Sequence, residues 1–171
     1  MAIELELQTD RHMMQVLSGL GEDAIRKASI AAGRRAALAA RTAGTKQVHS
    51  IYTIKSSDLK AKTKITTTED GATLRFSGST EKVEKYKAVK RKSGVFVTIK
   101  RGGTRKIARG FTIGSRFVAR EGRERLPVKS LYGPAVPQLY GNPEVMDIMQ
   151  ERGGQVLSER LEHEIERRLG V

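Results

Sequence analysis

Histidine is the side chain most often used for acid–base or metal chemistry near neutral pH, and this chain has three, His12, His49 and His163. They fall in three separate predicted helices, and none has a partner acid or a second ligand at metal-binding spacing. The chain contains no cysteine, which excludes disulfides, thiolate metal sites and cysteine nucleophiles. We therefore expect neither a metal ion nor a cofactor.

Other patterns that could support catalysis are also weak. The run from Gly110 to Gly114 lacks the strand–helix context and the lysine of a phosphate-binding P-loop. Glu159, Glu162 and Glu166 recur at helical spacing, which indicates the solvated face of a helix rather than an acid–base pair. No serine lies in a nucleophile-elbow context. The sequence thus predicts no catalytic residues and a protein that is not an enzyme.

Positive charge is the strongest chemical signal in the chain. Its 171 residues include 32 Lys and Arg against 19 Asp and Glu, a formal net charge of +13. Residues 82–129 hold 16 basic and three acidic side chains, so this segment carries the whole excess. We interpret its basic side chains as a surface that faces a polyanion such as DNA, with these candidates: Lys87, Lys90, Arg91, Lys92, Lys100, Arg101, Arg105 and Lys106.

The alternative interpretation of this basic segment is a solvated hairpin whose charges serve solubility. Only Tyr86 and Phe96 in the segment could stack on bases, and no base-reading motif is present. Any contact with nucleic acid is therefore expected to be electrostatic and nonspecific.

The elements that position this segment begin with a strand and two helices. Ile3, Leu5 and Leu7 alternate with glutamates, which predicts a half-buried strand. A short helix is predicted from Thr9 and Asp10 to Leu17. A long helix follows from Glu22 to about Ser50, with alanines at three- or four-residue spacing and a possible break at Gly44.

Turn residues then predict a β region. Asp70-Gly71 lies between residues 62–68 and 72–78, a pattern typical of a hairpin. Gly102-Gly103 predicts a second hairpin, whose first strand directs Val95, Val97 and Ile99 inward. One or two further strands are expected between Phe111 and Val118.

The segment 126–141 is uncharged except for Lys129 and contains three of the four prolines. Proline disfavours regular helix and central strand, so we expect an extended arm. The arm either packs across its own sheet or clips onto a neighbouring subunit. In the second case the interface residues are Leu126, Pro127, Leu131, Tyr132, Pro134, Val136 and Tyr140. A last helix starts at Asn142-Pro143 and is expected to be interrupted at Gly153-Gly154.

Together these patterns predict one α+β domain over residues 1–171. It has a mainly helical part (1–50), a basic β region with a small antiparallel sheet of about five strands (51–125), a proline-rich extended arm (126–141) and a C-terminal helix (142–171). No window approaches 18 consecutive apolar residues, and the acidic N-terminus does not read as a signal peptide. We expect an intracellular protein with no membrane contact.

Three stretches of the chain resemble the prophage minor tail protein Z family of tail completion proteins. They are Tyr52–Lys60, Gly94–Lys106 followed by Gly110-Phe111, and Arg125–Gln138, which is the most specific. Their order, between a long helix and a final helix, extends the resemblance over roughly residues 20–165.

The resemblance implies a non-enzymatic virion component that completes the head-proximal end of a phage or prophage tail and joins it to the head. Its implied partners are further copies of itself in a ring, by analogy a hexamer, together with other tail and connector proteins and the DNA in the channel, which it contacts nonspecifically. The implied location is the virion tail, and the host cytoplasm before assembly. The alternative is a cytosolic, nonspecific nucleic-acid-binding module.

Overall fold

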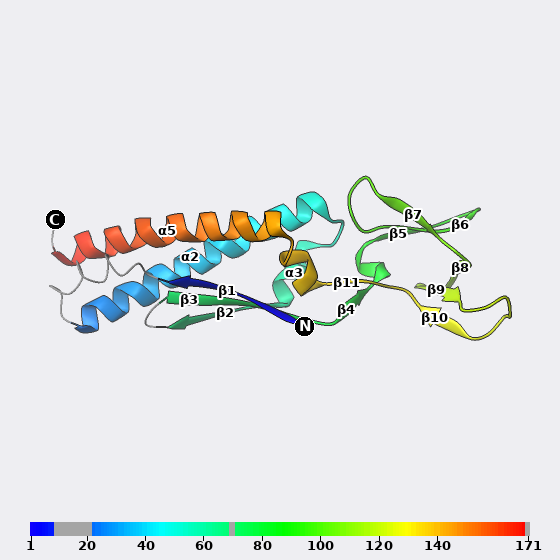
Figure 1. Cartoon of the computed structure of the whole chain (residues 1–171), viewed down its shortest axis with the longest axis horizontal. Helices are drawn as coiled ribbons and strands as arrows, with labels where there is room; N and C mark the ends of the chain where they lie inside the picture. The colour runs from blue at the N-terminus through cyan, green and yellow to red at the C-terminus, as the bar shows by residue number, and fades with distance from the viewer. Residues whose placement is uncertain (9–21, 69–70, 170–171) are drawn as a thin grey trace.

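Two long antiparallel helices form one layer of the body of the molecule (Figure 1). The computed structural model describes residues 1–8, 22–68 and 71–169, so the helix predicted from Thr9 to Leu17, with His12, lies outside the described residues. Helix α2 (Glu22–Ile51) has 30 residues, about 45 Å of axis, and α5 (Pro143–Leu169) has 27. The long helix predicted from Glu22 is confirmed.

Glycines at the contacts of these helices do not interrupt them, contrary to the expected break at Gly44 and interruption at Gly153-Gly154. A Cβ at Gly44 would overlap the Met149 side chain, and one at Gly153 would lie 2.7 Å from Cδ2 of Leu7. Both glycines therefore provide room for a neighbouring side chain, a gain that offsets their low helix propensity.

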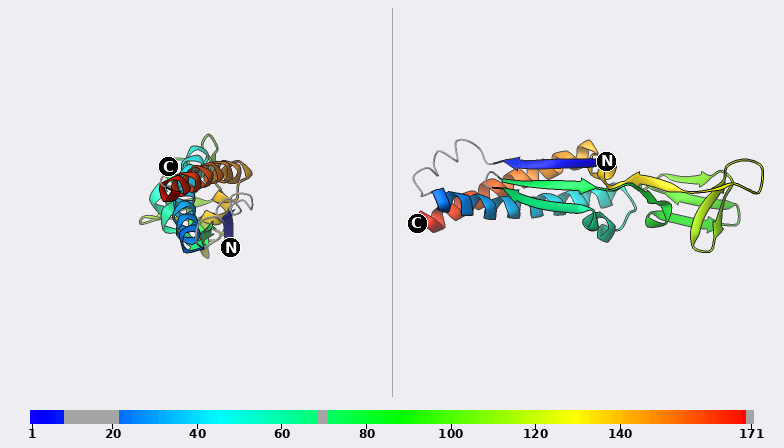
Figure 2. Two further views of the ribbon diagram at one scale, coloured as in Figure 1. Left: turned by 90° about the vertical axis from the view of Figure 1, so that its left-hand side faces the viewer. Right: turned by 90° about the horizontal axis from the view of Figure 1, so that it is seen from below.

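A three-stranded antiparallel sheet forms the second layer of the body (Figure 2). Its order is β1 (Ala2–Gln8), β3 (Gly71–Ser77), β2 (Thr63–Thr68). Leu5 pairs with Leu74, which pairs in turn with Ile65. The first strand and the hairpin at Gly71 are thus confirmed. The alternate residues of β1 and β3 join the alanines of α2, Ala32, Ala36, Ala37 and Ala40, in one buried core.

The predicted extended arm is wrong in its C-terminal part. Helix α4 (Val136–Tyr140) lies there, with Pro137 in its first turn, where a missing backbone N–H costs nothing. The Tyr140 ring stacks on Phe76 with centroids 4.0 Å apart, and its hydroxyl lies 2.8 Å from Oγ1 of Thr45. This segment therefore packs into the core of its own chain.

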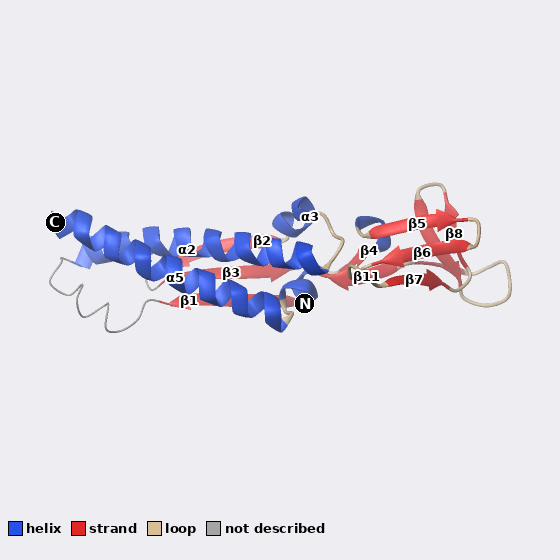
Figure 3. Ribbon diagram, turned by 90° about the horizontal axis from the view of Figure 1, so that it is seen from above, coloured by secondary structure: helices blue, strands red, loops and turns tan. Residues whose placement is uncertain are grey.

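A separate β lobe extends from the far end of the body (Figures 1 and 3). We call it the distal lobe, residues 80–135. The ribbon of β4 (Thr80–Lys82) and β11 (Tyr132–Ala135) leads to two three-stranded antiparallel sheets. One has the order β5 (Lys87–Arg91), β6 (Gly94–Thr98), β7 (Thr104–Ile107); the other has β10 (Val128–Ser130), β9 (Arg116–Arg120), β8 (Gly110–Ile113).

The distal lobe has its own small core, made of Val83, Val95 and Val97 with half-buried residues around them. The hairpin at Gly102-Gly103 and the strands around Phe111 are confirmed. The α+β class is also confirmed, but the described residues form eleven short strands in four sheets, where one sheet of about five strands was expected.

The distal lobe is attached to the body at more than the β4–β11 ribbon. The amide of Thr53 donates to the carbonyl of Ile99 at 3.0 Å, and the amide of Arg101 donates to the carbonyl of Ile51 at 2.8 Å. In the 3₁₀ turn Val83–Lys85, Nζ of Lys85 lies 2.8 Å from a carboxylate oxygen of Glu81 and 3.6 Å from one of Asp58, which belongs to α3 (Ser56–Ala61).

Candidate functional site

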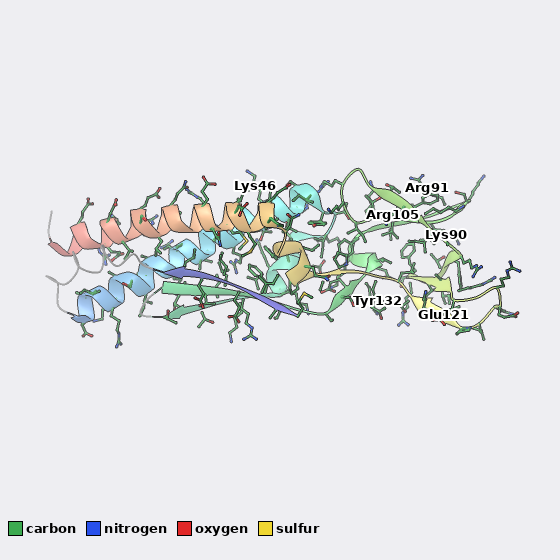
Figure 4. All side chains as sticks on the ribbon, in the orientation of Figure 1. Lys46, Lys90, Arg91, Arg105, Glu121 and Tyr132 are labelled. Atoms are coloured by element: carbon green, nitrogen blue, oxygen red, sulfur yellow. The ribbon has the colours of Figure 1, made fainter. Side chains whose placement is uncertain are left out.

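The body and the distal lobe differ in net charge. The distal lobe holds 16 basic and four acidic side chains, whereas the rest of the chain has 16 basic and 15 acidic side chains. Figure 4 labels Lys90, Arg91 and Arg105 on this lobe and Lys46 on the body for comparison. The molecule is therefore an electrically balanced body with a positively charged projection.

Three of the predicted polyanion-facing residues share one face of the β5–β6–β7 sheet. Cross-strand pairing places Lys87 beside Thr98, and Lys106 beside Phe96. Alternation along β5 puts Arg91 on the same face, where its guanidinium carbon lies 4.8 Å from the Phe96 ring centroid. We call this the outer face, because Val95 and Val97 of β6 point to the opposite, buried side.

The other five predicted residues lie elsewhere. Lys90 and Arg105 are exposed on the flanking strands, on the side of the sheet that Val95 occupies, and Lys92 follows in the turn after β5. Nζ of Lys100 lies 5.9 Å from the ring centroid of Tyr52 in the body.

Arg101 serves as a link between the lobes. Its Nε donates to the carbonyl of His49 at 2.8 Å, and its Nη2 lies 3.1 Å from Nδ1 of the same residue. The structure therefore brings together part of the predicted set and turns Lys100 and Arg101 toward the body.

Tyr86 cannot stack on a base, contrary to the expectation. Its side chain is buried, and its hydroxyl donates to the carbonyl of Pro134 at 2.7 Å. Burial raises the pKa of the Tyr86 phenol well above its ordinary value, with further contributions from Glu81 and Tyr52. Phe96 remains the one half-exposed aromatic ring of the two.

The sequence reasoning did not place five arginines of the distal lobe in a site. Arg116 and Arg120 lie on β9, Arg109 precedes β8, and Arg123 and Arg125 lie in the loop after β9. Three of them line a hollow of about 380 Å³ together with Phe111. The signal that could have found them is the turn at Gly114, which sets the register of the β8–β9 hairpin.

The predicted assembly interface is split between surface and core. Leu126 and Tyr132 are 69% and 56% exposed, and Pro127 is also exposed. Leu131 and Pro134 are half-buried, with Leu131 against the distal core. Val136 and Tyr140 are fully buried in the body, so their assignment to an exposed interface is wrong.

A groove of about 880 Å³ runs between α2 and α5 on the side away from the sheet. Its lining mixes apolar side chains such as Leu38 and Ile148 with basic and acidic ones such as Arg35 and Glu151. Within the described ranges no group of three or more His, Asp or Glu side chains could hold a metal ion. His49 contacts Arg101, and His163 is exposed on α5.

None of the helices in the described part of the chain is both long and apolar enough to cross a bilayer. Comparisons of the chain with protein-family models, with curated proteins and with solved structures find no match.

Proposed function

We propose that the chain is a structural component of a phage or prophage tail that completes the head-proximal end of the tail and joins it to the head. In this proposal it forms a homo-oligomeric ring around the DNA channel, with six copies as the resemblance implies. Its partners are neighbouring tail and connector proteins and, nonspecifically, DNA. It is neither an enzyme nor a membrane protein, and it resides in the virion tail after a period in the host cytoplasm.

The observation that carries the proposal is the separation of charge from packing along the molecule. A ring needs subunit surfaces that pack against each other and a lumen that tolerates DNA phosphates. The balanced body, with its long helices, suits the first role, because no net repulsion opposes the approach of a second copy. The distal lobe suits the second, because Lys87, Arg91 and Lys106 present exposed cations on one face.

Two exposed apolar side chains of the distal lobe provide the proposed contact with a neighbouring protein. Tyr132 lies on β11, and Leu126 lies in the loop before β10. Aromatic anchors are frequent hot spots of interfaces, which favours Tyr132 as the main contact residue.

The experiment that tests the proposal is complementation of tails assembled without this chain. Purified protein is added to such tails, and the fraction joined to heads is counted by negative-stain electron microscopy. We expect the wild-type chain to restore joined particles and to appear as a ring at the head-proximal end. A chain that restores no particles and is not found on tails would contradict the proposal.

Two matched triple variants separate the lumen from general charge. Lys87, Arg91 and Lys106 changed to Gln remove three charges from the outer face, whereas Lys27, Arg34 and Lys64 changed to Gln remove three from exposed positions of the body. We expect the first variant to dock but to impair DNA passage, and the second to behave as wild type. Equal effects of both would assign the positive charge to solubility.

A second candidate function is a nonspecific nucleic-acid-binding module, favoured by the position of Phe96 under Arg91 on the outer face. An exposed ring flanked by cations can stack on unpaired bases. This alternative predicts tight binding to single-stranded DNA without tails, weakened by Phe96→Ala. The tail proposal predicts only weak, steeply salt-dependent binding that Phe96→Ala leaves unchanged.

A further inference from the structure

The tip of the distal lobe brings like charges together without a carboxylate between them. In the β8–β9 hairpin, Gly110 pairs with Ala119, and the same register sets Arg109 directly opposite Arg120. The amide of Arg120 donates to the carbonyl of Arg109 at 3.4 Å. Like charges directly opposite each other on an antiparallel ladder are destabilising. A bound anion would relieve the repulsion between the two guanidinium groups.

A third arginine completes the group. The loop after β9 carries Arg123 to the same hollow, which Arg109, Phe111 and Arg120 also line. All three arginines are exposed, and in the described part of the chain no ion pair joins any of them to a carboxylate, including the nearby Glu121. The hollow therefore has three guanidinium groups and no internal counter-charge.

Arg120 has an aromatic contact within the hollow, and Arg109 has an unusual backbone conformation. The guanidinium carbon of Arg120 lies 5.4 Å from the Phe111 ring centroid, a cation–π contact between two residues that line the hollow. Arg109 has a φ of 54°, and among the described residues it is the one non-glycine residue with positive φ. A non-glycine residue in this conformation costs backbone energy and often marks a functional position.

We infer that this hollow binds a phosphate group, either free inorganic phosphate or a phosphodiester of a nucleic-acid backbone. Guanidinium groups present paired N–H donors that match phosphate oxygens, and they form charge-assisted hydrogen bonds with them. A phosphate in the hollow would neutralise the Arg109–Arg120 repulsion and accept from Arg123. The site lies apart from the outer face of β5–β6–β7, and it does not depend on the proposed tail function.

The test is a titration of the full chain with inorganic phosphate, followed by NMR of the arginine Nε–Hε and backbone amide signals at constant ionic strength. We expect saturable shifts at Arg109, Arg120 and Arg123. Arg120→Gln should weaken phosphate binding about fivefold, the equivalent of about one net hydrogen bond. Arg116→Gln is the matched control, because Arg116 is exposed on the same strand and face but does not line the hollow. It should change the affinity less than twofold.

A second arm distinguishes the two sources of phosphate. A short DNA duplex is titrated under the same conditions, with and without inorganic phosphate. If the duplex shifts the signals of the same arginines and inorganic phosphate reverses these shifts, the ligand is a backbone phosphodiester. If inorganic phosphate shifts these signals and the duplex does not, the ligand is free phosphate. Both results support the hollow. If Arg120→Gln lowers the melting temperature, Arg123→Gln in the loop replaces it.

The inference is overturned if phosphate gives no saturable shift at these arginines, or if Arg116→Gln weakens binding as much as Arg120→Gln and Arg123→Gln do. Because the titration contains no tails, either result leaves the complementation experiment and its interpretation unaffected.

Discussion

A close backbone approach between the two layers of the body can be tested with the same substitution made at two glycines. Gly33 of α2 faces β3, and a Cβ built on it would lie 2.9 Å from the carbonyl carbon and 3.0 Å from the carbonyl oxygen of Gly71. These atoms are backbone, so they cannot move without shifting the strand. Gly154 of α5 has open space around its Cβ position. Ala is therefore expected to have opposite effects at the two positions.

The magnitudes follow from two competing terms. Replacing a helical Gly by Ala stabilises by about 1 kcal/mol through helix propensity, and Gly154→Ala should gain that amount. Gly33→Ala has the same gain but also an overpacking cost of about 1–3 kcal/mol, so we expect a net loss of about 1 kcal/mol. The two variants should thus differ by about 2 kcal/mol, or about 4–8 °C in melting temperature for a chain of this length.

Far-UV circular dichroism at 222 nm during urea unfolding is the suitable assay, because both long helices belong to the body and dominate the signal. Gly44→Ala provides an intermediate case, since its Cβ would meet the flexible end of Met149 rather than backbone. Equal stabilisation by Gly33→Ala and Gly154→Ala would refute the close contact between α2 and β3.

Three further predictions concern the tyrosines and Arg109. Tyr132→Ala should change the free energy of unfolding by less than about 0.5 kcal/mol yet abolish tail joining. Tyr140→Ala should lower the free energy of unfolding by about 3–5 kcal/mol. Urea unfolding measures the stability of both variants, and particle counts measure tail joining. Burial raises the pKa of Tyr86 and Tyr140, so these phenols lose their protons at lower pH in the unfolded chain than in the folded one. The free energy of unfolding should therefore fall as the pH rises above about 10, which urea unfolding at pH 9 and 11 tests. A Tyr86→Phe variant should lose less stability between these two pH values. Arg109→Gly should stabilise by about 0.5–1 kcal/mol by relieving the positive φ while weakening phosphate binding, and an unchanged phosphate affinity would remove Arg109 from the hollow.

Local patterns were sufficient to predict the helices and hairpins. Alanine spacing indicated α2, and the turns at Gly71 and Gly102-Gly103 set two hairpins with the observed inward residues Leu74, Val95 and Val97. These features depend on residues close together in the chain. The short strands of the distal lobe and its division into separate sheets depend on pairings that a pattern of two or three residues does not specify.

Long-range packing explains the wrong predictions. Tyr140 is uncharged and follows prolines, which reads as an exposed arm, but it is buried because Phe76 and Thr45 receive it from elements far away in the sequence. The basic cluster was recognised as a segment, but its division into faces required the strand register. Arg101 in particular was unpredictable, since its partner is the carbonyl of His49 on another element.

The β4–β11 ribbon has a consequence for how such a molecule can diversify. The chain leaves the body at Thr80 and returns at Ala135, and these residues are direct partners in the ribbon. The two chain ends of the projection therefore lie side by side, as in an inserted segment, although Ile99, Arg101 and Lys85 of the projection also contact the body. During evolution this inserted segment can change in length or in charge while the helices and sheet of the body keep their packing. Selection can thus change what the projection touches without redesigning the scaffold that holds it.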